Sequence, residues 1–137
     1  MGLILDSSAA VAAERQGMNA RQLFGSIREQ AGDDEIAISV VTLLELAHGI
    51  ARSDTPERRE RRQRFVDELM SVVPFHGVTA LVALRAGRID GRSQASGVRI
   101  PLSDLLIGVT ALELGYAVAT HNLRHFAMIP SLIVKPL

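Results

Sequence analysis

The stretch Leu3-Ile4-Leu5-Asp6-Ser7-Ser8 decides the fold class, because it joins a short apolar strand to the start of a helix. Three consecutive apolar residues followed by capping residues predict a strand that is buried on both faces and enters a helix at once. Farther along, Ile36-Ala37-Ile38 is again short and apolar, and a helix over about Val40–Arg52 follows it. A repeated strand–helix unit of this kind is typical of a parallel sheet with helices on its faces.

The rest of the chain continues the same alternation. Further helices are predicted over about residues 20–30, 56–70, 79–93 and 103–114, and further strands over about 72–75, 116–120 and 132–135. Residues 121–125 are predicted to form a loop. No repeat or linker divides the chain, so we expect one domain over residues 1–137, of the α/β class, with three α/β/α layers around a central, mainly parallel sheet.

Composition excludes several classes of protein. With 47% hydrophobic and 22% charged residues in 137, the chain is too apolar to be disordered and long enough to bury a core. No apolar run reaches the roughly 18 to 20 residues that span a bilayer, and the N-terminus lacks the basic region of a signal peptide. The absence of cysteine excludes disulfides and thiolate metal sites and suits the reducing cytoplasm. We therefore expect a cytoplasmic protein that makes no membrane contact.

Polar side chains gather at one predicted edge of the sheet. Asp6 follows the first strand directly, Glu45 lies within two turns of the end of the second strand, and Asp104 opens the helix before the strand that ends at Thr120. Asn122 comes just after that strand. Ligands of open parallel sheets bind beyond the carboxyl ends of the strands, so these residues are the natural candidates for a site.

Each acid also has an ordinary structural explanation. Asp6 and Asp104 are good helix caps, and Glu45 fits a solvated stripe on its helix. Together, however, three carboxylates at one edge repel one another unless a cation lies among them, and oxygen ligands suit Mg²⁺ or Mn²⁺. Such an ion activates water and polarises a phosphoryl oxygen, which predicts phosphodiester hydrolysis.

Four motifs, in this order, resemble those of PIN-domain ribonucleases, and more specifically of the VapC toxins of toxin–antitoxin pairs. They are Leu5-Asp6-Ser7-Ser8, Val41-Thr42-Leu43-Leu44-Glu45-Leu46, Pro101-Leu102-Ser103-Asp104-Leu105-Leu106-Ile107 and Ala119-Thr120-His121-Asn122-Leu123-Arg124-His125-Phe126. The resemblance covers nearly the whole chain. It implies a single PIN domain, a metal-dependent endoribonuclease that acts on RNA, a homodimer, and inhibition by a VapB-type antitoxin.

The resemblance also implies roles for individual residues. Asp6, Glu45 and Asp104 become the catalytic acids that bind Mg²⁺, with Mn²⁺ as the alternative. Asn122 falls at a fourth position where many relatives have Asp, which leaves occupancy by a second metal open. Ser7 and Thr120 are expected to support the acids or a metal-bound water.

Other features allow more than one interpretation. Arg58, Arg61 and Arg62 belong to a basic run that is either a solvated helix face or a set of contacts to RNA phosphates. His121 and His125 are four residues apart but lack the pattern of a zinc site on a helix.

The function also has alternatives, and the surface suggests where a partner would dock. A catalytically weak PIN-like module that binds RNA or protein is one alternative, and a phosphatase or DNA nuclease with the same acids is another. The helices over about residues 8–14, 20–30 and 41–50 carry surplus apolar residues, which predicts a groove for an amphipathic partner helix.

Overall fold

The first strand lies at the centre of the sheet. In the computed structural model, which describes residues 1–137, the strands are β1 (Leu3–Leu5), β2 (Ile36–Ser39), β3 (Phe75–His76), β4 (Ala117–Thr120) and β5 (Val134–Pro136). Their order is β3-β2-β1-β4-β5, and every neighbouring pair is parallel. Leu5 is level with Ile38 and with Ala119, so β1, β2 and β4 end at the same edge.

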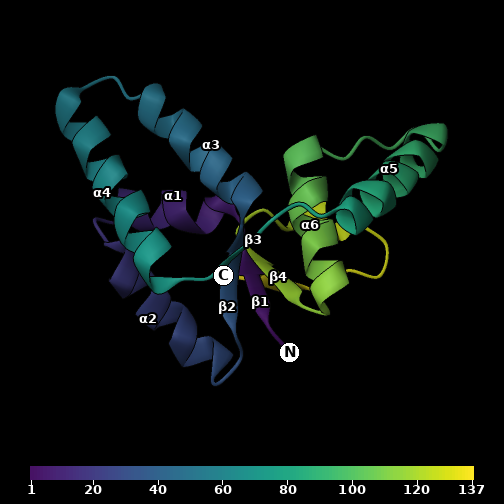
Figure 1. Cartoon of the computed structure of the whole chain (residues 1–137), viewed down its shortest axis with the longest axis horizontal. Coiled ribbons are helices and arrows are strands. Elements are labelled where there is room, and N and C mark those ends of the chain that lie inside the picture. Colours follow the sequence, from purple (N-terminus) through teal and green to yellow (C-terminus); the bar gives the residue numbers. More distant parts are fainter.

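Helices connect the strands and cover both faces of the sheet (Figure 1). They are α1 (Ser7–Arg15), α2 (Ala20–Ala31), α3 (Val40–Ala51), α4 (Pro56–Val72), α5 (Ala80–Ala95), α6 (Leu102–Leu114) and α7 (Leu123–Ala127). The predicted three-layer α/β/α fold with a parallel sheet is confirmed.

The pleat of the strands divides the core in two. Leu3 and Leu5 pack with α1, α2 and α4 on one face, whereas Ile4 packs with α5, α6 and α7 on the other. Successive side chains of a strand point to opposite faces, which is why a strand that is apolar at every position is buried on both sides. Gly108 allows close packing of α6, because a Cβ there would overlap the Ile129 side chain.

One hairpin extends beyond the sheet. Helix α3 starts where β2 ends, and Figure 1 shows α3 and α4 side by side as an arm that leads away from the sheet. Only Thr42 of α3 is fully buried although the helix is strongly apolar, and Leu44 is 69% exposed. An apolar helix with so little burial leaves surface for a partner.

The structure differs from the sequence predictions mainly near the C-terminus. The predicted loop over residues 121–125 is wrong in its second half, because α7 begins at Leu123 and is anchored by the fully buried Phe126. Strand β3 covers Phe75–His76 rather than 72–75, since α4 continues to Val72. Strand β5 likewise begins at Val134 rather than at residue 132.

Candidate functional site

Asp6 is held in place by two hydroxyl groups. The Ser8 hydroxyl donates to Asp6 Oδ1 at 2.6 Å and the Thr120 hydroxyl donates to Asp6 Oδ2 at 2.9 Å. Asp6 occupies the N-cap position of α1, and its side chain is 4% exposed. One carboxylate oxygen is therefore oriented by a local contact from Ser8 and the other by a tertiary contact from Thr120, which a helix cap alone does not require.

Ser8 joins the two strand ends on either side of this carboxylate. Besides donating to Asp6, its Oγ accepts the backbone N–H of His121 at 3.0 Å and lies 3.3 Å from Thr120 Oγ1. The Asn122 backbone N–H in turn donates to Thr120 Oγ1 at 2.8 Å. Residues more than 110 positions apart in sequence thus form one hydrogen-bonded network around Asp6.

Glu45 reaches the same edge from α3. The Ser7 hydroxyl donates to Glu45 Oε1 at 3.1 Å, and the Ser103 hydroxyl of α6 lies near enough to this carboxylate to lower its pKa. Glu45 is half-buried, so it is not the freely solvated residue that its helical stripe allowed. Burial raises the pKa of Glu45, and the charges of Asp104 and Asp6 raise it further.

Asp104 is paired with a histidine. His125 Nδ1 lies 2.7 Å from Asp104 Oδ2, and the Asn122 side-chain nitrogen lies 2.9 Å from the same ring atom. One ring nitrogen cannot donate to the carboxylate and accept from the amide at once, and the charged carboxylate is the stronger partner. Nδ1 therefore carries the proton and donates it to Asp104. Asp104 is not the cap of α6, because the helix begins at Leu102 with Pro101 before it.

The three acids influence one another electrostatically. Burial raises the pKa of Asp6, the hydroxyls of Ser8 and Thr120 lower it, and the charge of Asp104 raises it again. No Lys or Arg side chain forms an ion pair with Asp6, Glu45 or Asp104. The edge of the sheet therefore concentrates carboxylates that no Lys or Arg neutralises.

The donor set fits a hard divalent cation in its chemistry and its charge. Oxygen atoms of carboxylates and amides are the ligands that Mg²⁺ and Mn²⁺ prefer. In the arrangement described, no three His, Asp or Glu side chains converge closely enough to coordinate one ion together. Asp6 is directed at Ser8 and Thr120, Glu45 at Ser7, and Asp104 at His125, so binding an ion requires at least some of these side chains to reorient.

The raised pKa of Glu45 predicts a pH-dependent cost of keeping it charged. A carboxyl whose pKa is higher in the folded state binds its proton more tightly there, so stability is lost as pH rises above the ordinary value of 4.5. In EDTA, Glu45→Gln is expected to be more stable than wild type at pH 8 but not at pH 4. We expect the free energies of unfolding of the two proteins to differ by less than about 1 kcal/mol, because water screens a partly exposed group. Urea unfolding at both pH values measures this, and a pH-independent difference would contradict it.

The arginine run of α4 is largely engaged within the protein. Arg58 pairs with Asp54 at 3.1 Å, and Arg61 pairs with Glu14 at 3.2 Å. Arg62 has more contacts: its Nε lies 3.5 Å from Glu14, and its Nη1 donates to the carbonyl of Gly49 and the hydroxyl of Ser53, both at 3.0 Å. Arg62 thus ties α4 to α1 and to the last turn of α3.

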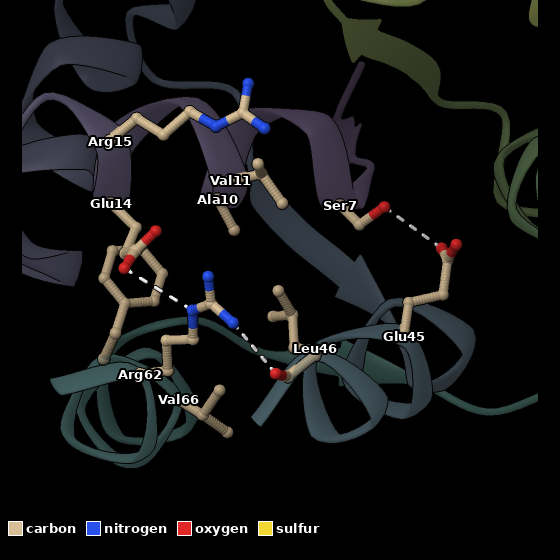
Figure 2. A pocket seen from close by; sticks show the side chains of 11 residues that line it. Ser7, Ala10, Val11, Glu14, Arg15, Glu45, Leu46, Arg62 and Val66 are labelled. Carbon is tan, nitrogen blue, oxygen red and sulfur yellow. Dashed lines mark hydrogen bonds and ion pairs between the residues drawn. The ribbon is translucent and has the colours of Figure 1, made fainter. Parts of the chain in front are cut away.

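A groove adjoins the acidic edge between α1, α3 and α4. Its cavity of about 350 Å³ has apolar walls that include Ala10, Val11, Leu46, Phe65 and Val66. Figure 2 shows the Ser7–Glu45 hydrogen bond at one end of the groove and the Glu14–Arg62 pair at the other. Helix α2, which the sequence suggested as part of a partner surface, contributes no residue to this cavity, whereas α4 does.

The structure brings most of the predicted site residues together and adds others. Asp6, Ser7, Glu45, Asp104, Thr120 and Asn122 all lie at the carboxyl edge of the sheet, while Arg58, Arg61 and Arg62 lie on the arm. Sequence reasoning missed Ser8, Ser103 and His125. Ser8 and Ser103 lie close in sequence to predicted acids, and His125 lies on α7, the helix after Thr120. Nothing in the spacing of the motifs distinguishes these three residues from their neighbours. His121 does not join His125 in a shared site.

Comparisons with known proteins agree with this geometry. The model of the PIN domain family matches residues 3–130. Over 130 residues the chain is 35% identical to "Ribonuclease VapC10" of Mycobacterium tuberculosis, covering 95% of this chain and 90% of that one. It is 30% identical over 137 residues to "Ribonuclease VapC" of Rickettsia bellii, covering 98% and 95%.

Solved structures show the same architecture. The chain is similar, with a TM-score of 0.85 and 25% identity, to a chain of VapBC2 from Rickettsia felis bound to a DNA fragment from their promoter, covering 100% of this chain and 99% of that one. No helix of the structure is long and apolar enough to cross a membrane.

Proposed function

Because the chain belongs to the PIN-domain family and its VapC ribonucleases, we propose that it is an Mg²⁺- or Mn²⁺-dependent endoribonuclease, the toxin of a toxin–antitoxin pair. The observation that carries this proposal is the meeting of Asp6, Glu45 and Asp104 at one sheet edge, where no Lys or Arg neutralises them. The activity belongs to a single PIN domain spanning residues 1–137.

Asp6, Glu45 and Asp104 would hold the cation, with Asn122 as a neutral neighbour. The bound ion would supply water activation and charge neutralisation at a phosphodiester. Ser8 and Thr120 hold the Asp6 carboxylate in one orientation, and Ser7 does the same for Glu45. His125 orients the Asp104 carboxylate by donating a hydrogen bond to it. Asn122 adds no charge, so it favours one metal site over two.

Dependence on a divalent ion is the direct test. The purified chain is expected to cleave a labelled RNA in Mg²⁺ or Mn²⁺ and to lose cleavage entirely in EDTA, because the acids alone cannot neutralise charge on the phosphodiester. Adding back the ion should restore cleavage. Full cleavage in EDTA, with nuclease contamination excluded, would contradict the proposal. RNA binding without cleavage in either ion would favour the catalytically weak PIN-like module.

We propose that the arginines of α4 have two roles: Arg62 stabilises the fold, and the exposed arginines contact RNA phosphates. Arg62→Gln is expected to lower the free energy of unfolding by about 1–2 kcal/mol, since it removes the charge-assisted hydrogen bonds of Arg62 to the Gly49 carbonyl and the Ser53 hydroxyl. Arg58→Gln and Arg61→Gln remove only exposed ion pairs and should each cost less than about 0.5 kcal/mol. If Arg58, Arg61 and Arg62 also contact phosphates, the Arg58→Gln/Arg61→Gln variant will bind RNA with a shallower salt dependence. Urea unfolding and binding titrations in increasing salt separate the two roles.

We also propose that the partner is a VapB-type antitoxin and that the chain forms a homodimer. The solved relative from Rickettsia felis is a VapBC complex, which supports the first part. Leu44 of α3, Leu81 and Leu84 of α5 and Leu102 of α6 are each 59–69% exposed, which supports an apolar contact between copies. Light scattering of wild type and of Leu84→Glu tests the dimer, because a charge at the contact should yield monomers.

A further inference from the structure

A polar cavity lies on the opposite side of the molecule from the groove of Figure 2. It measures about 470 Å³ and is bounded by α5, the end of α6 and the loop at Pro130 and Ser131. Helix α5 lies at the far side of the molecule from α2 and α4 (Figure 1). We call this the α5 arginine surface, and its polar residues are Arg85, Arg88, Arg92, Ser93, Glu113 and Ser131.

The arginines of this surface share one face of α5. Their spacing of three and four residues places Arg85, Arg88 and Arg92 above one another along the helix. Arg85 pairs with Glu113 at 3.1 Å, whereas Arg88 and Arg92 make no ion pair and no side-chain hydrogen bond. Asp90, the acidic residue of α5, accepts hydrogen bonds from the Gln94 amide. The surface therefore carries two unpaired cations in a chain whose net charge is zero.

Unpaired hydroxyl groups border the same cavity. Neither Ser93 nor Ser131 has a side-chain hydrogen bond within the protein, and both line the space beside the arginines. Two guanidinium groups and two hydroxyl groups thus present donors with only Glu113 as an acidic neighbour. Guanidinium and hydroxyl donors are those that proteins use to bind phosphate oxygens without reading base sequence.

We propose that the α5 arginine surface binds the phosphodiester backbone of the RNA substrate at a distance from the cleavage site, through Arg88 and Arg92. This inference rests on the proposed ribonuclease function. Glu113 and Asp104 are nine residues apart on α6, so the surface lies about 14 Å along the helix axis from the acidic edge. An RNA of more than a few nucleotides can reach both places, whereas a very short one cannot. The surface would therefore favour large, folded RNAs as substrates.

The test compares a double variant with a matched control. Arg88→Gln/Arg92→Gln removes the two unpaired cations, and Arg21→Gln/Arg52→Gln removes two exposed arginines that form no ion pair, on α2 and at the tip of the arm. Binding of fluorescent transfer RNA is titrated in EDTA at several salt concentrations, and cleavage of the same RNA is measured in Mg²⁺. Circular dichroism and thermal unfolding verify that both variants fold.

We expect Arg88→Gln/Arg92→Gln to bind transfer RNA at least tenfold more weakly, with a log–log salt slope reduced by about 0.7 to 0.9 for each lost contact. The control variant should bind within about twofold of wild type. Wild-type affinity and slope in the double variant would overturn the inference while leaving the ribonuclease proposal intact. A different result would separate the two proposals in the other direction. If the double variant binds RNA more weakly than wild type but the wild-type chain cleaves no RNA, the RNA-binding surface is supported and the ribonuclease proposal is overturned.

Discussion

Replacing Asp6 with Asn is expected to lower the rate of RNA cleavage by roughly three orders of magnitude, and Asp104→Asn should do the same. Asp6 is the most buried of the three acids and lies directly at the end of the central strand. Substitution by Asn removes both a charge and a ligand from the site proposed to hold the cation. Because Asn has nearly the same shape as Asp, the fold should be retained.

The control for these variants is an acid of the same type outside the site. Asp67 is exposed on α4 and accepts a hydrogen bond only from Gln63, so Asp67→Asn removes equal charge at no cost to cleavage. Ser8→Ala provides an intermediate case, with a loss of about 10- to 100-fold, because Ser8 orients Asp6 without being a proposed ligand. Cleavage assays in Mg²⁺ measure the activity of each variant, and thermal unfolding verifies that each variant folds. Full activity of both Asp6→Asn and Asp104→Asn would reject this site.

An antitoxin-type partner is expected to abolish cleavage when it occupies the groove of Figure 2. The groove has apolar walls suited to an amphipathic helix, and it ends at Ser7 and Glu45 beside the acidic edge. An Arg or Lys of that helix could neutralise the acids in place of the cation. The complex should cleave at least about 100-fold more slowly than the free chain, and inhibition should weaken as the Mg²⁺ concentration rises.

Variants of both molecules test this mode of inhibition. Val11 is 41% exposed on the groove wall, so Val11→Asp should prevent docking while cleavage by the free chain is kept. Val98→Asp is the matched control, because Val98 is similarly exposed, at 37%, but lies outside the groove. In the partner, the basic residues are replaced by Ala one at a time. Inhibition that survives Val11→Asp, or that no basic residue and no Mg²⁺ concentration alters, would contradict the mechanism.

The fold class followed from local patterns in the sequence. Leu3-Ile4-Leu5 and Ile36-Ala37-Ile38 are apolar at every position, and only a strand covered on both faces buries such a run. The helices that follow these strands were predicted from the spacing of their apolar residues and from their capping residues. Local signals were weakest where tertiary contacts decide the structure: α7 forms because Phe126 is buried against α6 and the sheet, which no helical pattern around His125 indicated.

The placement of the acids at one edge was predictable for a related reason. Parallel strands end together, so a residue that directly follows a strand, such as Asp6, has its position determined by the topology alone. The hydrogen-bond partners of the acids were not predictable from the topology. The sequence suggested Ser7 and Thr120 as supports, and each does contact an acid, but Ser8, which contacts both Asp6 and Thr120, had no distinguishing signal.

The sequence by itself therefore determined the alternation of strands and helices up to β4, the layers and the edge at which the acids gather, because hydrophobic periodicity encodes which residues are buried. Only the tertiary structure decided that Asp104 faces His125, that Arg62 ties the arm to α1, and that Arg88 and Arg92 stay unpaired beside a cavity. These contacts join segments distant in sequence or depend on which rotamer the surrounding packing allows. Periodicity carries no information about either, since it records whether a side chain is buried and not what it meets there.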